Sequence, residues 1–275
     1  MSEAAAPTPI TLHCETRGDG KPLVLLHGFG ANAFTWRHLM ERLPAGYRAF
    51  ALDLKGFGQS PKPRDNAYAM EDQANLVCDF IERNGLKSVA LAGHSMGGGV
   101  AALTAMKLCD RGAPPSALIL IDTISFPQRV PLFIGVLRTP VLNWMVVTLV
   151  PAVTLVRGAL NLAFHDWRKV TAKMVRAYST PFKQPGGRHA AIATAMQIIP
   201  ANIDALIARL PDLKIPTLIL WGREDPITPL AHGERLAQVI PHARLVVIDR
   251  CGHIPQEERP DETIPAIATF LETSR

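Results

Sequence analysis

Short apolar runs bounded by turn-forming residues recur along the whole chain. They include Pro22–Leu26, Ala49–Leu52, Ser88–Ala92, Ala117–Ile121, Pro216–Trp221 and Arg244–Ile248. Each run is nearly continuous in Val, Leu and Ile instead of alternating with polar residues. That pattern is typical of strands covered on both faces, as in a parallel sheet. Ile10–Glu15 is expected to add an antiparallel edge strand.

Most gaps between these runs hold a segment with helical spacing of its apolar residues. In 70–84, one face of the expected helix carries Ala74, Val77, Cys78 and Ile81. Strands that alternate with helices predict an α/β fold with right-handed crossovers.

One gap is too long for a crossover. Thr123–Ile215 contains 93 residues, which predicts an inserted helical cap. We therefore expect a core formed by residues 1–123 and 202–275, and a cap formed by residues 124–201.

The middle of the expected cap, Thr139–Val156, contains no charged residue. Its 18 residues are of borderline length for a membrane-spanning helix. Several residues disfavour that interpretation: Pro140, Asn143, Thr148, Pro151 and Thr154. We expect a pair of cap helices broken at Pro151 instead.

Composition and charge narrow the choice of partners. The chain has 275 residues, is 48% hydrophobic and carries a net charge of +5, so a large core is expected. Between Ile124 and Pro200 there are nine Lys or Arg and one acidic residue, Asp166. No basic run is interleaved with aromatic residues, which argues against a nucleic-acid partner. A basic, apolar cap suits peripheral contact with an anionic membrane, although ordinary solvated cap helices would carry the same charges.

The four cysteines and the N-terminus indicate a reducing compartment. Cys14, Cys78, Cys109 and Cys251 match neither a zinc-site spacing nor a disulfide framework. The first residues lack the basic and apolar regions of a secretory signal, so we expect a cytoplasmic location.

The strongest chemical motif is Gly93-His-Ser-Met-Gly97, between an apolar run and an Ala-rich helical segment. A Ser on a sharp strand-to-helix turn adopts strained backbone angles and needs small residues two positions before and after it. Ser95 is therefore the predicted nucleophile. The N–H of the next residue, Met96, is expected to face a developing oxyanion.

A serine nucleophile needs a base, and the base needs an orienting acid. Asp225 and His253 each follow an apolar run, so both are expected at the carboxyl edge of the sheet. Asp122 is an alternative acid, while Glu224 is expected to be a solvated neighbour. Phe29, after the first parallel strand, is expected to supply a second oxyanion N–H.

Taken together, the motifs HGFG, DLKGFGQS, GHSMGG, GREDPITP and GHIPQEERP resemble those of the α/β-hydrolase-fold serine hydrolases. The resemblance covers residues 10–123 and 215–271 but not the cap. It implies a mostly parallel, eight-stranded sheet with helices on both faces. It also implies Ser95 as nucleophile, His253 as base and Asp225 as acid, with an acyl-enzyme cycle that needs no metal or organic cofactor.

Other polar residues near these motifs are interpreted as structural. His27 is expected to hold the loop that bears Phe29, and His94 to face the core or a hydrogen bond. Asp53 and Ser60 are expected to shape a turn.

The apolar cap suits an acyl chain, so we expect hydrolysis of small-molecule carboxylic esters with short-to-medium acyl chains or monoacylglycerol-like lipids. Trp144, Met145 and Ile254 are the expected substrate-binding residues. The sequence does not indicate an oligomeric state.

Three alternatives remain open. One is carbon–carbon bond hydrolysis of ring-cleavage products, whose anionic substrates could meet Arg188; His94 and Ile254 depart from the usual pattern of those enzymes. Perhydrolysis by the same triad is another. The third is a non-catalytic binding protein of the same fold.

Overall fold

The computed structural model describes residues 10–128 and 130–274. Its strands form one sheet in the order β1-β3-β2-β4-β5-β6-β7. The strands are β1 (Cys14–Gly18), β2 (Lys21–Leu26), β3 (Tyr47–Leu52), β4 (Ala90–His94), β5 (Ala117–Ile121), β6 (Thr217–Gly222) and β7 (Ala243–Ile248). Only β1 is antiparallel to its neighbour. The expected edge strand is thus confirmed, although it begins at Cys14 and not at Ile10.

The expectation of eight strands is wrong for the described residues, which form seven. Each parallel strand corresponds to one of the six apolar runs, and β1 accounts for the edge. The expectation of an eighth strand rested on the family resemblance alone, and the further apolar stretches of the sequence, in the cap, form helices.

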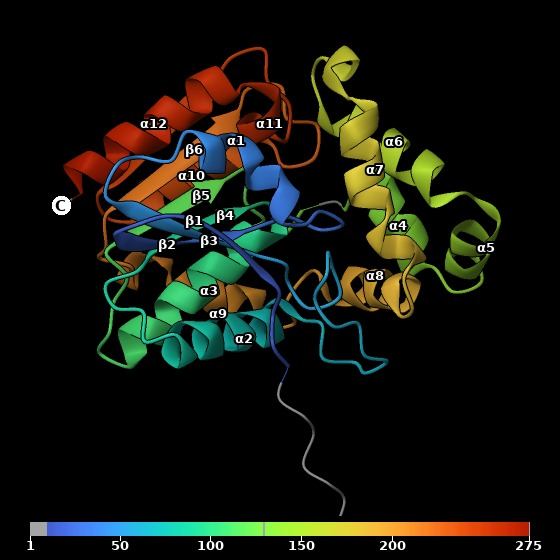
Figure 1. Cartoon of the computed structure of the whole chain (residues 1–275), viewed down its shortest axis with the longest axis horizontal. Helices are drawn as coiled ribbons and strands as arrows, with labels where there is room; N and C mark the ends of the chain where they lie inside the picture. The colour runs from blue at the N-terminus through green and yellow to red at the C-terminus, as the bar shows by residue number, and fades with distance from the viewer. Residues whose placement is uncertain (1–9, 129, 275) are drawn as a thin grey trace, which may run out of the picture.

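Helices cover both faces of the sheet. The core contains the α-helices α1 (Arg37–Glu41), α2 (Met70–Arg83), α3 (Met96–Asp110), α9 (Ile203–Ala208), α10 (Leu230–Val239), α11 (Pro255–Glu258) and α12 (Pro260–Thr273). It also contains the short 3-10 helices η1 (Ala33–Trp36) and η4 (Leu210–Asp212). Figure 1 shows α12 and α1 on one side of the sheet and α2 and α3 on the other.

Successive residues of a strand pack into two separate hydrophobic cores, one on each face of the sheet. Val24 and Leu26 of β2 pack with α2, α3 and α10, whereas Leu23 and Leu25 pack with α1 and α12. All four side chains are fully buried. Because both faces of the strand are covered, its sequence shows no alternation of apolar and polar residues.

The segment between β5 and β6 is helical. It contains α4 (Leu132–Arg138), α5 (Leu142–Leu149), α6 (Ala152–Ala163), η2 (Trp167–Lys169), α7 (Ala172–Ser179), η3 (Pro181–Lys183) and α8 (Gly187–Gln197). Figure 1 shows α4 to α8 grouped at one side of the sheet. We call this group the cap; its exact boundaries at 124 and 201 stay predictions.

The uncharged stretch 139–156 is divided between α5 and α6, with the break at Pro151 as expected. Within residues 10–128 and 130–274, no single helix is long and apolar enough to cross a membrane. Helices α4 and α5 satisfy the length and composition only as a pair bent by 110°.

The strand order places a crevice at the carboxyl ends of β2 and β4. The chain moves from β2 to β3 on one side and then returns to add β4 on the other side of β2. In open α/β sheets, ligands bind at such a reversal of strand order. The loops after these two strands carry Phe29 and Ser95.

Candidate active site

Ser95 lies on a sharp turn between β4 and α3, with φ 54° and ψ −121°. Gly93 and Gly97, two residues before and two residues after Ser95, make the turn possible. A Cβ on Gly93 would lie 2.1 Å from the Gly97 carbonyl oxygen, and a Cβ on Gly97 would lie 2.4 Å from the His27 carbonyl oxygen. The expected strained turn is therefore present, and close backbone packing explains why it needs glycine.

A hydrogen-bonded chain joins the ends of three strands. His253 Nε2 lies 2.9 Å from Ser95 Oγ, and His253 Nδ1 lies 2.7 Å from Asp225 Oδ2. The His253 side chain is almost buried and that of Asp225 is fully buried. With Nδ1–H donating to the carboxylate, Nε2 is free to accept the Ser95 hydroxyl proton.

Asp225 is held as an anion by its surroundings. Its Oδ1 accepts backbone N–H bonds from Ile227 at 2.7 Å and Thr228 at 3.0 Å, and its Oδ2 also accepts the Thr228 hydroxyl. Burial alone would raise the pKa of Asp225, but the adjacent His253 and these side-chain hydrogen bonds lower it to about 2. The carboxylate therefore stays charged at neutral pH and can orient the imidazole.

Asp122, the alternative acid, lies nearby but makes no hydrogen bond to His253 among the described residues. It is fully buried, and its Oδ1 accepts the Gly222 N–H at 2.9 Å. Burial, together with the charge of Asp225, raises its pKa well above the usual value. The geometry favours Asp225 as the partner of His253.

Asp122, Asp225 and His253 also form the one group of close metal-ligating atoms in residues 10–128 and 130–274, within 4.8 Å of one another. The atoms of Asp225 and His253 that such an ion would need are hydrogen-bonded to each other. The arrangement therefore suits proton transfer better than metal binding.

Two backbone N–H groups lie beside Ser95 and have no hydrogen-bond partner among the described residues: those of Phe29 and Met96. Met96 is the first residue of α3, where helical N–H groups lack an intrahelical acceptor and the helix dipole favours negative charge.

Two buried histidines hold the loops of the site. His27 Nδ1 lies 2.7 Å from the Gly28 carbonyl oxygen, and its Nε2 accepts the Leu54 N–H at 3.0 Å. His94 Nε2 lies 2.7 Å from the His253 carbonyl oxygen. Burial, and then the proximity of His253, lower the pKa of His94 to about 3. Both histidines form hydrogen bonds that hold these loops, as expected from the sequence.

The turn residues Asp53 and Ser60 are also structural. Asp53 accepts the backbone N–H groups of Ala33 and Gln59, each at 2.7 Å. Ser60 donates to the Asp53 carbonyl oxygen. Together they fix the loop next to His27.

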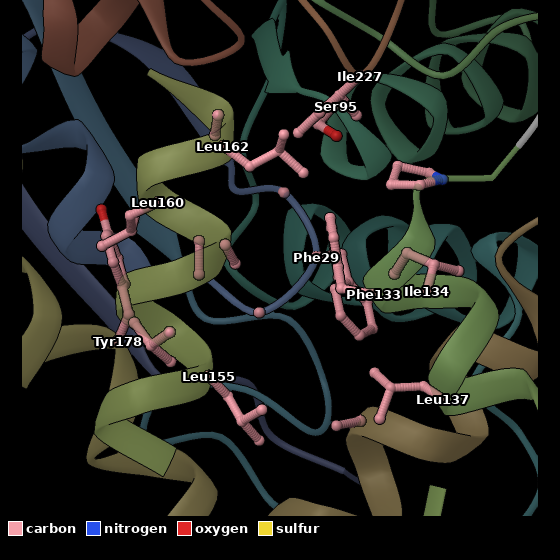
Figure 2. Close-up of a pocket in the computed structure, with 18 of the residues that line it drawn as sticks. Phe29, Ser95, Phe133, Ile134, Leu137, Leu155, Leu160, Leu162, Tyr178 and Ile227 are labelled. Atoms are coloured by element: carbon pink, nitrogen blue, oxygen red, sulfur yellow. The ribbon is translucent and has the colours of Figure 1, made fainter. Parts of the chain in front are cut away.

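Above Ser95 lies an apolar pocket of about 540 Å³. Figure 2 shows it as an elongated space, with Ser95 and Ile227 at one end and Leu137 and Leu155 at the other. Helices α4 and α6 form its two long sides. Its lining is mostly apolar, so it suits an apolar chain.

Of the three expected substrate-binding residues, one lines the pocket and two do not. Ile254 is buried and lines the pocket. Trp144 and Met145 do not line it and are exposed on α5, whereas their neighbours Val146 and Val147 do line it. The expectation for Trp144 and Met145 needs correction, because an almost wholly apolar helix carries no polar face that would reveal its rotation.

Sequence reasoning missed two structural carboxylates in the motif GHIPQEERP. Glu257 is buried, accepts the Thr35 hydroxyl at 2.8 Å, and is also hydrogen-bonded to Arg37 and Tyr178. Glu258 accepts the Gly252 and Asp166 backbone N–H groups at 2.8 and 2.7 Å. It thereby ties the loop before His253 to the cap.

Sequence and structure comparisons agree with this arrangement. Residues 21–260 match the family model for the alpha/beta hydrolase fold. The chain is 30% identical to the uncharacterized hydrolase YugF of Bacillus subtilis, covering 90% of this chain and 89% of the relative. It is 27% identical to a 2-hydroxy-6-oxononadienedioate/2-hydroxy-6-oxononatrienedioate hydrolase of Comamonas testosteroni, covering 91% and 87%.

Among solved structures, a thermophilic esterase from Thermogutta terrifontis superimposes with a TM-score of 0.80 at 29% identity, covering 98% of this chain and 96% of the esterase. The family model matches most of the chain, and the strand order and the turn at Ser95 agree with it. The chain belongs to the α/β hydrolase fold family and is a hydrolase of that fold.

Proposed function

We propose that the protein hydrolyses carboxylic esters of short-to-medium acyl chains, including monoacylglycerol-like esters, through an acyl-enzyme on Ser95. The observation that carries the proposal is His253, hydrogen-bonded to both Ser95 and Asp225 at the end of an apolar pocket. Similarity to an esterase of known structure supports the ester as the reacting group.

In the first half of the cycle, the Ser95 oxygen attacks the ester carbonyl carbon while His253 Nε2 takes its proton. The carbonyl oxygen becomes an oxyanion, which the N–H groups of Phe29 and Met96 stabilise. His253 then gives the proton to the leaving alcohol as the carbon–oxygen bond breaks. Asp225 stabilises the imidazolium throughout but stays unprotonated.

In the second half, a water molecule takes the place of the alcohol. His253 removes its proton as the water oxygen attacks the acyl carbon, and the proton returns to Ser95 when the free acid leaves. One preorganised oxyanion donor typically contributes about 3 kcal/mol to transition-state stabilisation.

The pocket supports an acyl chain in preference to a polar substrate. Its walls on α4 and α6 are apolar, and the far end lies away from Ser95 (Figure 2). An acyl chain with its carbonyl at Ser95 would lie along this space and lose contact with water.

Kinetics on a series of p-nitrophenyl esters tests the proposal. We expect turnover of the butyrate and octanoate esters by the wild type, and at most residual turnover by Ser95→Ala. If the wild type left both esters intact, or if Ser95→Ala matched its rate, the proposal would fail.

Carbon–carbon bond hydrolysis is a second candidate, because Arg188 lines the pocket and has no ion-pair partner among the described residues. A guanidinium there suits a substrate carboxylate. The similarity to the Comamonas testosteroni hydrolase supports the same idea. A chromogenic dienoate discriminates the two candidates: its cleavage at rates above those for both esters would favour carbon–carbon hydrolysis.

A further inference from the structure

Helix α5 is apolar and yet contains no buried residue. Its sequence is Leu-Asn-Trp-Met-Val-Val-Thr-Leu. Trp144 is 63% exposed, Met145 42% and Leu149 69%. Figure 1 shows α5 at the outer edge of the cap, away from the sheet. Exposed apolar patches of this kind mark interaction sites on otherwise soluble folds.

The two faces of α5 have different neighbours. Val146 and Val147, with Val150 just after the helix, line the pocket. Leu142, Met145 and Leu149 do not, and their spacing of three and four residues places them on one exposed face. Helix α5 therefore lines the pocket with one face and exposes apolar side chains on another.

The backbone before α5 adds to this picture. Val141 has φ 68° and is exposed. A β-branched residue rarely adopts a positive φ. The corner between α4 and α5 thus holds a large apolar side chain outward at a conformational cost.

The charges around α5 have one sign. Between 123 and 165 the charged residues of the sequence are Arg129, Arg138 and Arg157, and no Asp or Glu occurs. A second copy of the chain that presented the same face would bring equal charges together. A layer of anionic headgroups over an apolar interior complements both the arginines and the apolar side chains.

We propose that Val141, Leu142, Trp144, Met145, Leu149 and Val153, flanked by Arg138 and Arg157, form a surface that docks the cap on anionic phospholipid membranes. We call it the docking surface. Leu132 and Leu162 line the pocket and are themselves exposed, so the apolar lining reaches the outside of the cap. The docking itself does not depend on the proposed ester hydrolysis.

Co-sedimentation with vesicles tests the docking surface. The vesicles are phosphatidylcholine alone, or phosphatidylcholine with about 30% phosphatidylglycerol. We expect the wild type to partition onto the anionic vesicles, and Trp144→Ser/Met145→Ser to bind them about ten-fold more weakly because two interfacial side chains are lost.

The chain offers a matched control for that variant. Trp167 is 62% exposed and Met196 is 49% exposed, but both lie outside the docking surface. Trp167→Ser/Met196→Ser makes the same chemical change at nearly the same exposures. It should bind anionic vesicles within about two-fold of the wild type.

The charge contribution is tested separately. Arg138→Gln/Arg157→Gln should weaken binding to anionic vesicles at least about five-fold, because each basic residue near the surface contributes to membrane attraction. Arg64→Gln/Arg244→Gln, which removes two exposed arginines of the core, should leave it unchanged.

Equal binding by the two Trp/Met double variants would overturn the proposal, as would equal partitioning of the wild type onto neutral and anionic vesicles. Sedimentation equilibrium without lipid adds a further test. A wild-type dimer lost in Trp144→Ser/Met145→Ser, with no vesicle binding, would assign the surface to a second copy instead. Ser95→Ala should bind vesicles as the wild type does, so docking and ester hydrolysis can fail independently.

Discussion

Ser95 and Trp144 belong to two regions of this molecule that are built from opposite kinds of contact. Around Ser95, short directional hydrogen bonds link Ser95, His253 and Asp225, and further bonds from His94 and Thr228 hold those groups in place. Around Trp144, helix α5 offers apolar side chains with no buried residue.

This difference explains why one region can be identified from a sequence motif and the other cannot. Directional bonds need particular residue types at particular positions, so a short motif is enough to identify them. Apolar contacts depend on area and shape, and many arrangements of Leu, Val and Met satisfy them. By our proposals, the first region therefore defines the reaction, while the second docks the protein on a membrane.

The largest expected effect distinguishes the two candidate acids of the site. Asp225→Asn should lower kcat/KM for p-nitrophenyl butyrate about 10⁴-fold, because the amide cannot stabilise the imidazolium. Asp122→Asn should lower it less than about ten-fold, because Asp122 accepts the Gly222 N–H and makes no hydrogen bond to His253 among the described residues. A larger loss in Asp122→Asn than in Asp225→Asn would mean that the acid has been misassigned.

Substitution of one glycine in each region compares the backbone packing at the serine turn with that in the cap. Gly97→Ala should reduce the free energy of unfolding by about 3 kcal/mol or more, since its Cβ would meet two carbonyl oxygens at 2.4 Å. Gly135→Ala in α4, which has no atom within 4 Å of the added Cβ, should increase it by about 0.5 kcal/mol. Urea unfolding measures both; equal changes would contradict the close packing at the serine turn.

The shape of the pocket is tested at its far end. Leu155→Trp should lower the octanoate-to-butyrate ratio of kcat/KM about ten-fold, because the indole fills the space that the longer chain would occupy. Leu149→Trp, on the outer face of α5, should leave the ratio near the wild-type value. Chain selection that responded equally to both variants would place the acyl chain elsewhere.

A pH-dependent effect concerns the buried histidine beside the site. The pKa of His94 is lowered to about 3 in the folded protein. Between pH 3 and about 6.5, the His94 imidazole is therefore protonated in the unfolded state but neutral in the folded state. Stability should therefore rise with pH in this window, by about 1.4 kcal/mol per pH unit from this group.

In His94→Gln, an amide can still donate to the His253 carbonyl oxygen but does not titrate. The variant should lose that part of the slope when unfolding by urea is followed from pH 4 to pH 6. An unchanged slope would show that His94 does not resist protonation in the folded state.

Much of the sheet and the site was predictable from sequence. The six apolar runs became six parallel strands, because strands covered on both faces must be apolar throughout. Ser95, Asp225 and His253 converge because each follows a strand of that sheet, and parallel strands present their carboxyl ends at one edge.

Which cap side chains face the pocket could not be predicted, for a physical reason. Within 139–156 no charged residue marks the solvent side, so Trp144 and Met145 could not be told from the pocket-lining Val146 and Val147. Glu257 and Glu258 were overlooked because their partners, such as Thr35 and Gly252, are set by tertiary packing as well as by the motif.

The central claim is that Ser95 is a nucleophile activated by His253. Reaction with a fluorophosphonate probe, followed by mass spectrometry of the peptides, tests it most directly. We expect one covalent adduct on the peptide that contains Ser95. The adduct should be absent in His253→Ala, whose fold circular dichroism should show to be retained. An unlabelled wild-type protein, or equal labelling after His253→Ala, would contradict it.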